Sequence, residues 1–211
     1  MTSLPTYWCQ RCRSPLEPNA DLQRPPWSTA EWIREFTLAQ DGGALPPERF
    51  LETALLWDDE YLYAAYRSAP ALVPVTKREN NSDLWKEHAV ELFLAAEDTG
   101  YYEIEVNPLG AVLDLHFPHE NADWIAARQW DAEGLRSAVS TTLFGNKEVW
   151  STEFALPWVD MPALFRQDDE MRAQICRSGG RPDGTFELPA WGPVRFQFCE
   201  SASMGRILLV P

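Results

Sequence analysis

The clearest pattern in the chain is an alternation of apolar and polar side chains between residues 89 and 117. The segments AVELFL (89–94), YYEIEVN (101–107) and AVLDLHF (111–117) each place aliphatic side chains on one side and mostly polar ones on the other. This period of two is typical of β-strands with one buried face. If these strands pair, their second face is polar and acidic, and we expect function there. That face would carry Glu91, Glu103, Glu105, Asp114 and His116.

The rest of the chain repeats the strand pattern. Two aliphatic and aromatic runs on either side of Asp58-Asp59-Glu60 predict a β-hairpin that turns at Asp58. At least eight short strands with Gly and Pro turns, and little helical periodicity, predict an all-β fold. We expect an antiparallel two-sheet β-sandwich of the immunoglobulin or jelly-roll kind. Further strands are predicted at 6–10, 136–143, 149–156, 171–177, 194–198 and 205–210.

Helices are expected to be few and short. Ser28-Thr29-Ala30-Glu31 has the spacing of a capping box and predicts one or two helical turns from Ser28. Residues 157–169 are expected to form a loop with at most one more helical turn. Residues 1–26 are polar and interrupted by prolines, which favours an N-terminal arm or an edge strand. The length of the chain predicts a single domain over residues 1–211.

The net charge of the chain argues against two classes of binding partner. The chain has 18 basic and 32 acidic residues and a formal net charge of −14, which would repel nucleic acids and anionic membrane surfaces. Its N-terminus lacks the pattern of a signal peptide and no apolar run is long enough to span a bilayer, so we expect a cytoplasmic protein. The ten tryptophans are unusually many, and some are expected to be exposed for flat, weakly polar ligands.

Seven segments resemble, in order, the family 9 carbohydrate-binding modules, which share a DOMON-type β-sandwich. The most specific combination is WDDEYLY (57–63) followed by W-x-x-x-x-V-E-x-F (85–93). The resemblance covers roughly Trp27 to Leu209 and implies the sandwich fold. The matching segments are PPWSTAEWIREF, LWDDEYLYAAY, LWKEHAVELFL, YYEIEVNPLGAVLDL, VWSTEFALPW, MRAQICR and MGRILL.

This resemblance implies a non-catalytic module that holds a mono- or oligosaccharide end between two aromatic side chains. Trp85 stands at the family's first aromatic position, six residues before Glu91, a sugar-binding glutamate in the family. Seven residues before Gly205, Phe198 takes the place of the second tryptophan. The family's strand arginine falls on Glu105, and its asparagine in the penultimate strand becomes Gln174.

The residue types themselves are compatible with a sugar-binding site, although some of the aromatic residues could instead be part of the core. An indole can stack on the C–H face of a sugar while carboxylates and amides bind its hydroxyls. Trp85 is suited to this role, although it could instead pack under its own loop, and Phe198 could be a core residue. Trp191, between Pro189 and Pro193, is an equally good second aromatic. The predicted ligand-binding residues are Trp85, Glu91, Glu105, Gln174, Trp191 and Phe198.

A catalytic alternative rests on Glu103 and Glu105. Their i, i+2 spacing on a strand separates the Cα atoms by roughly 6.7 Å, which overlaps the carboxylate separation of inverting glycosidases. The activity would then be hydrolysis of O-glycosyl bonds. The alternative is a hydrated acidic face neutralised in part by Arg172 or Arg177. We expect binding without catalysis.

Cofactor signals are weak. Cys9-Gln10-Arg11-Cys12 has the spacing of half a zinc site, but free thiols are favoured because no second half follows. Asp58, Asp59 and Glu60 could hold calcium or form a solvated turn. A DOMON-like scaffold for haem or a protein partner is a further alternative, with histidines at positions 88, 116 and 119. We therefore predict no resident cofactor, a saccharide as partner and a role in carbohydrate catabolism.

Overall fold

The computed structural model describes residues 4–96, 100–119, 122–144, 146–164, 169–194 and 198–211. These ranges contain thirteen strands and one α-helix, α1 (Trp124–Ala127). No helix within them is long and apolar enough to cross a membrane. The strands are β1 (Thr6–Arg11), β2 (Thr37–Leu38), β3 (Leu51–Trp57), β4 (Tyr61–Ser68), β5 (His88–Ala95), β6 (Tyr101–Val106), β7 (Val112–Phe117), β8 (Arg136–Phe144), β9 (Lys147–Pro157), β10 (Glu170–Gly180), β11 (Phe186–Glu187), β12 (Pro189–Ala190) and β13 (Gly205–Val210).

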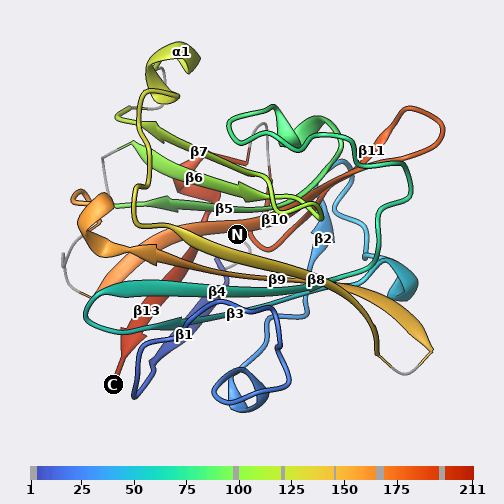
Figure 1. Cartoon of the computed structure of the whole chain (residues 1–211). Coiled ribbons are helices and arrows are strands. Elements are labelled where there is room, and N and C mark those ends of the chain that lie inside the picture. Colours follow the sequence, from blue (N-terminus) through green and yellow to red (C-terminus); the bar gives the residue numbers. More distant parts are fainter. Residues whose placement is uncertain (1–3, 97–99, 120–121, 145, 165–168, 195–197) are drawn as a thin grey trace.

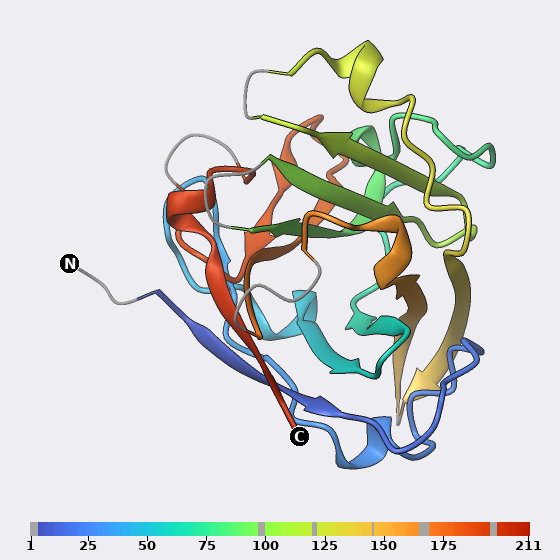
Figure 2. The ribbon, with the colours of Figure 1, turned by 90° about the vertical axis from the view of Figure 1, so that its left-hand side faces the viewer.

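The strands form one curled sheet in two facing layers (Figures 1 and 2). Its order is β7-β6-β5-β10-β13-β1-β3-β4-β9-β8; the short β11 and β12 pair with β10, and β2 pairs with β12. The predicted all-β sandwich is confirmed. The sheet is mixed rather than wholly antiparallel, because β1 runs parallel to both β13 and β3.

The first strand corrects one expectation. The polar N-terminal segment was expected to be an arm or an edge strand, but β1 pairs with β13 on one side and β3 on the other, so it is interior. Its polarity reflects alternation: Tyr7 and Cys9 are buried, whereas Trp8 is 52% exposed. An interior strand therefore looks polar when one of its faces meets solvent.

The main core lies between the two layers and is built by alternating residues. Val90, Leu92 and Leu94 of β5 contribute to it from one layer, and Leu55 of β3 and Phe154 of β9 from the other. The predicted hairpin at Asp58 is also confirmed. Burial of these side chains supplies the main stabilising free energy of such a sandwich.

The helix predicted from Ser28 is wrong beyond a single 3-10 turn, Trp27–Thr29. After it the chain is extended: Ile33 bridges to Thr53, and Thr37 and Leu38 form β2. Long-range contacts override the local capping signal here, since the Trp27 indole N–H donates to Glu153 on β9 at 2.8 Å. The strand predicted at 194–198 lies mostly outside the described residues.

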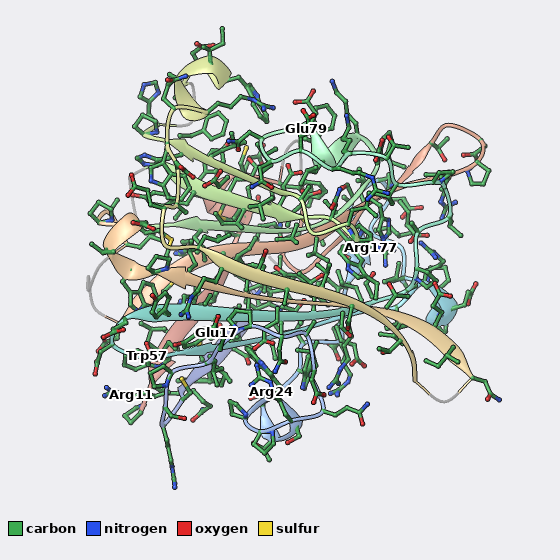
Figure 3. The ribbon with its side chains drawn as sticks, in the orientation of Figure 1. Arg11, Glu17, Arg24, Trp57, Glu79 and Arg177 are labelled. Carbon is green, nitrogen blue, oxygen red and sulfur yellow. The ribbon has the colours of Figure 1, made fainter. Side chains whose placement is uncertain are left out.

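Glu153 holds the N-terminal segment against β9. It is fully buried, and its carboxylate accepts hydrogen bonds from the backbone N–H groups of Asn19 and Ala20 at 2.9 and 3.0 Å. It also pairs with Arg24 at 2.6 Å, which is labelled on the lower loop of Figure 3. One carboxylate thus satisfies several donors of a segment that has little regular structure.

The register between β6 and β7 overturns part of the predicted acidic face. Ile104 lies opposite Asp114, and Tyr102 lies opposite His116. Asp114 and His116 therefore point to the main core side, where His116 stacks on Tyr102 with ring centroids 4.2 Å apart. The turn sets this register, because the Asn107 N–H bonds to the Ala111 carbonyl and makes Val106 face Val112.

Candidate functional site

The outer face of β5, β6 and β10, on the side away from the main core, carries the candidate site. Glu91 on β5 lies directly opposite Glu105 on β6 and Cys176 on β10. Glu103 shares this face because it is two residues from Glu105. The rest of the face is apolar and aromatic, with Phe93, Tyr101, Leu113, Leu115 and Phe117 in one cluster. The face is thus not the hydrated acidic surface expected, but three carboxyl groups set among apolar side chains.

The three glutamates form a compact buried group, called here the carboxylate cluster. Glu91, Glu103 and Glu105 are 3%, 6% and 0% exposed, and one carboxylate oxygen from each lies within 4.8 Å of the others. Neither oxygen of Glu105 has a hydrogen-bond partner among the described residues, and nor does Oε1 of Glu91. The other oxygen of Glu91 is 3.5 Å from the thiol of Cys176.

Burial dominates the electrostatics of the cluster. It raises the pKa of Glu91 to about 7. Burial and the neighbouring charge of Glu91 raise the pKa of Glu103 to about 8. The pKa of Glu105 is raised well above its ordinary value by burial and by both neighbouring carboxylates. Charged carboxylates at this separation repel one another strongly in a region poor in water, so the cluster favours partners that supply positive charge or protons.

A cavity of about 520 Å³ opens beside the cluster. Trp85 and Trp124 stand at it with 38% and 43% of their surfaces exposed. This volume falls in the range of small-ligand sites, roughly 300–1,000 Å³. We call it the aromatic pocket. Its lining residues are Trp85, Glu91, Phe93, Tyr101, Glu103, Trp124, Ser178, Phe186, Leu188, Phe198 and Cys199.

Three of the six predicted binding residues line this pocket together. They are Trp85 from the 3-10 turn Leu84–Lys86, Glu91 from β5, and Phe198. The ring of Phe198 packs against that of Phe93, with ring centroids 6.2 Å apart. Glu105 lies behind them and does not line the cavity, although it touches the site through the carboxylate cluster.

The other two predicted residues lie elsewhere. Gln174 is buried, and its amide exchanges hydrogen bonds with the backbone of Gly192 at 2.7 and 3.2 Å. The Trp191 ring packs over the backbone of Gly205, so close that a Cβ at Gly205 would lie 2.5 Å from it. Both stabilise the join between β10, β12 and β13 and do not reach the aromatic pocket.

Sequence reasoning missed several lining residues. Trp124 comes from α1, which lies beside β7, and its ring meets Phe117 edge-on at 5.4 Å. Phe93 and Tyr101 share the face of the glutamates by strand alternation, but no local signal marks them as pocket residues. Trp124 is separated from Trp85 by 39 positions, so only the packing of α1 onto β7 could reveal it.

The positions of Glu103 and Glu105 do not match the catalytic alternative, in which both would act on one ligand. Glu103 reaches the pocket, but Glu105 is fully enclosed and does not. The carboxyl group that shares the pocket with Glu103 is that of Glu91. Arg177, a predicted neutraliser, points to the opposite face, where it pairs with Glu187 and donates to the Ser68 hydroxyl at 2.9 Å.

The remaining cofactor hypotheses find no matching arrangement in the described part of the chain. Asp58 accepts hydrogen bonds from the Glu60 and Tyr61 N–H groups, both at 2.8 Å, and from the Tyr63 hydroxyl at 2.7 Å. Its neighbour Asp59 pairs with Arg11. These carboxylates already have partners in the turn, and both also line an adjoining hollow of about 210 Å³ together with Arg11.

The cysteines and histidines are dispersed. Cys9 packs in the main core and Cys12 in the cluster outside β3 and β4, and burial raises the pKa of the Cys12 thiol to about 11. Among the described residues, the carboxylate cluster is the one group of three side chains close enough to share a metal ion. The histidines form no such group.

The fold matches one class of structure: the β-sandwich of the family 9 carbohydrate-binding modules. No protein-family model and no curated protein sequence matches the chain. The similarity is to solved structures and covers nearly the full length.

Three of the similar structures illustrate this. A Bacteroides uniformis protein to which carbohydrate binding is assigned has a TM-score of 0.75 at 16% identity, with 99% of this chain and 100% of that chain covered. A family 9 module from Caldicellulosiruptor kristjanssonii in complex with cellotriose has a TM-score of 0.64 at 15% identity, covering 97% and 93%. The complex with glucose has a TM-score of 0.66 at 13% identity, covering 97% and 95%. At these identities the similarity establishes the fold.

Proposed function

We propose that the protein binds a mono- or oligosaccharide, or the end of one, in the aromatic pocket without transforming it. The observation that carries this proposal is the pocket itself, in which Trp85 and Trp124 stand half-exposed beside Glu91 and Glu103. The glucose and cellotriose complexes of modules with the same fold support the ligand class. An association with carbohydrate catabolism rests on the sequence resemblance alone.

Each group has a physical role in this proposal. An exposed indole stacks on the apolar face of a pyranose and excludes water from it. Phe198 supplies a smaller second ring. The carboxyl groups of Glu91 and Glu103 accept or donate hydrogen bonds to sugar hydroxyls, since they lie at the border between apolar face and cavity. Gln174 and Trp191 act at a distance by fixing the strands that frame the site.

The test is a titration of tryptophan fluorescence with glucose and with cellotriose, for wild type and Trp85→Ala. We expect a saturable change in wild type and a loss of at least about tenfold in affinity for Trp85→Ala. Trp8→Ala is the matched control, because Trp8 is 52% exposed on β1 and does not line the pocket. No response in wild type to a panel of neutral sugars would contradict the proposal.

Hydrolysis of O-glycosyl bonds is the second candidate. It is favoured by the position of Glu91 and Glu103, whose carboxyl groups share one pocket, and by the pKa of Glu103, raised to about 8, which suits a general acid. Release of reducing sugar from cellotriose that is abolished in Glu103→Gln would establish it. Unchanged cellotriose after long incubation with a protein that binds it would reject it.

A further inference from the structure

The carboxylate cluster leaves buried oxygens without partners. Glu105 is 0% exposed, yet no donor is in full hydrogen-bond geometry with either of its oxygens, and the groups that act on them are the Glu103 carboxyl group and the Trp85 backbone. Oε1 of Glu91 also lacks a donor in full hydrogen-bond geometry among the described residues. A buried, unpaired carboxylate is costly, and native proteins rarely keep one without a compensating partner.

No side chain in the described ranges supplies that compensation. None of the ion pairs in these ranges includes Glu91, Glu103 or Glu105. The basic side chain that acts on Glu103 at longer range is Arg128, whose guanidinium is bound to Asp83 and the Asn81 carbonyl. Within the described ranges, the charge of the cluster is therefore left for protons or for a bound cation to neutralise.

The spacing of the oxygens fits a metal ion. One oxygen from each glutamate lies within 4.8 Å of the other two. A calcium ion takes oxygen ligands at roughly 2.3–2.6 Å, so two ligands on opposite sides of it lie up to about 5 Å apart. An all-oxygen, all-carboxylate set is typical of calcium, magnesium or manganese and not of the softer metals.

We propose that Glu91, Glu103 and Glu105 bind a hard divalent cation of the calcium class at the floor of the aromatic pocket. The strands pre-position the ligands: Glu91 and Glu105 form a cross-strand pair, and Glu103 follows on the same face. Glu91 and Glu103 also line the pocket, so the cation would face the ligand space. In one respect this rests on the proposed function: a sugar in the pocket would bind partly through the cation.

Direct binding is tested without sugar. Protein stripped with a chelator is titrated with terbium, whose oxygen-ligand preference follows that of calcium, while indole is excited and terbium emission is recorded. Because Trp85 and Tyr101 line the same pocket, we expect saturable emission that calcium displaces. Glu105→Gln and Glu91→Gln should each weaken this response by at least about tenfold.

The controls separate this site from other acidic groups. Glu148→Gln alters an exposed acid on β9, and Asp59→Asn alters the acidic turn, so both should leave the emission unchanged. A second readout is the melting temperature, which calcium should raise in wild type and not in Glu105→Gln. Emission that persists in Glu105→Gln, or that is lost in Asp59→Asn, would overturn the inference.

Failure of this inference differs from failure of the proposed function. Sugar binding that is equal with chelator and with calcium, and without terbium emission, would overturn the cation site and leave sugar binding intact. Terbium emission without any sugar response would support the cation site and count against sugar binding. Strong preference for glucosamine over glucose in metal-free buffer would also overturn the cation, since an ammonium group would then neutralise the cluster.

Discussion

Glu91 and Glu105 lie directly opposite each other on β5 and β6, buried to 3% and 0% exposure. Opposed like charges destabilise a strand pair, and burial strengthens the repulsion. A buried pair of this kind lowers the folding stability of the sheet, so we expect the pair to have a function that offsets this cost. The adjoining aromatic pocket, which Glu91 lines, indicates that this function is ligand binding.

The first prediction concerns the cost of this pair to the free energy of unfolding. Glu105→Gln should stabilise the metal-free protein by about 1–2 kcal/mol at neutral pH, because glutamine keeps the shape of the side chain and removes a carboxyl group that must either be buried as a charge or take up a proton on folding. Urea denaturation in the presence of a chelator measures it. The exposed control Glu148→Gln should change stability by less than about 0.5 kcal/mol. Destabilisation by Glu105→Gln would mean that the carboxyl group makes a favourable contact within the fold.

The second prediction concerns Trp124, which was not expected at the site. Trp124→Ala should weaken sugar binding by about 1–2 kcal/mol if its exposed ring stacks on the ligand. Calorimetric titration with cellotriose measures the change. Ile125→Ala, at an exposed neighbour on the same helix, is the control for damage to α1. Equal losses in both variants would assign Trp124 a structural role only.

The third prediction concerns the N-terminal segment. Glu153→Gln should lower the free energy of unfolding by about 2–4 kcal/mol, because it leaves Arg24 partly buried without its charged partner and weakens the bond from Trp27. Glu17→Gln, which removes the more exposed pair with Arg136, should cost about 0.5 kcal/mol. Denaturation curves compare the two. Sugar binding at the distant pocket should persist in the folded fraction of both.

The fourth prediction is a pH dependence. His88 is fully buried beside Trp150, and burial, with Arg177 and Arg49 nearby, lowers its pKa from 6.5 to about 3. The unfolded chain binds a proton below pH 6.5 that the folded chain does not take up until about pH 3, so stability is lost as the pH falls through this window. Relative to His88→Gln, wild type should lose about 1.4 kcal/mol per pH unit below 6.5.

Denaturation series from pH 7.5 to pH 5 test this dependence. Glu187 pairs with both nearby arginines and is present in each variant, so the difference between wild type and His88→Gln isolates the histidine. His119→Gln serves as the control because His119 is exposed. Parallel curves for wild type and His88→Gln would show that His88 takes up its proton in the folded state.

Local patterns predicted most of the strands because side-chain direction alternates along any extended segment. The segments AVELFL and YYEIEVN therefore placed Glu91, Glu103 and Glu105 on one face without knowledge of their neighbours. The same reasoning put Asp114 and His116 on that face and failed. Which side of one strand meets which side of the next depends on the register, and a single turn sets it.

The sequence by itself determined the all-β character, the hairpin at Asp58 and the common face of the three glutamates, since each follows from local alternation and turn chemistry. The tertiary structure alone decided that this face is buried, that Trp124 joins Trp85 at one pocket, and that Trp191 and Gln174 lie apart from it. Those facts depend on how Trp124, Phe186 and Phe198 come to line one pocket with residues of β5 and β6. Packing of that kind is a sum of contacts between residues far apart in the chain, which no local pattern records.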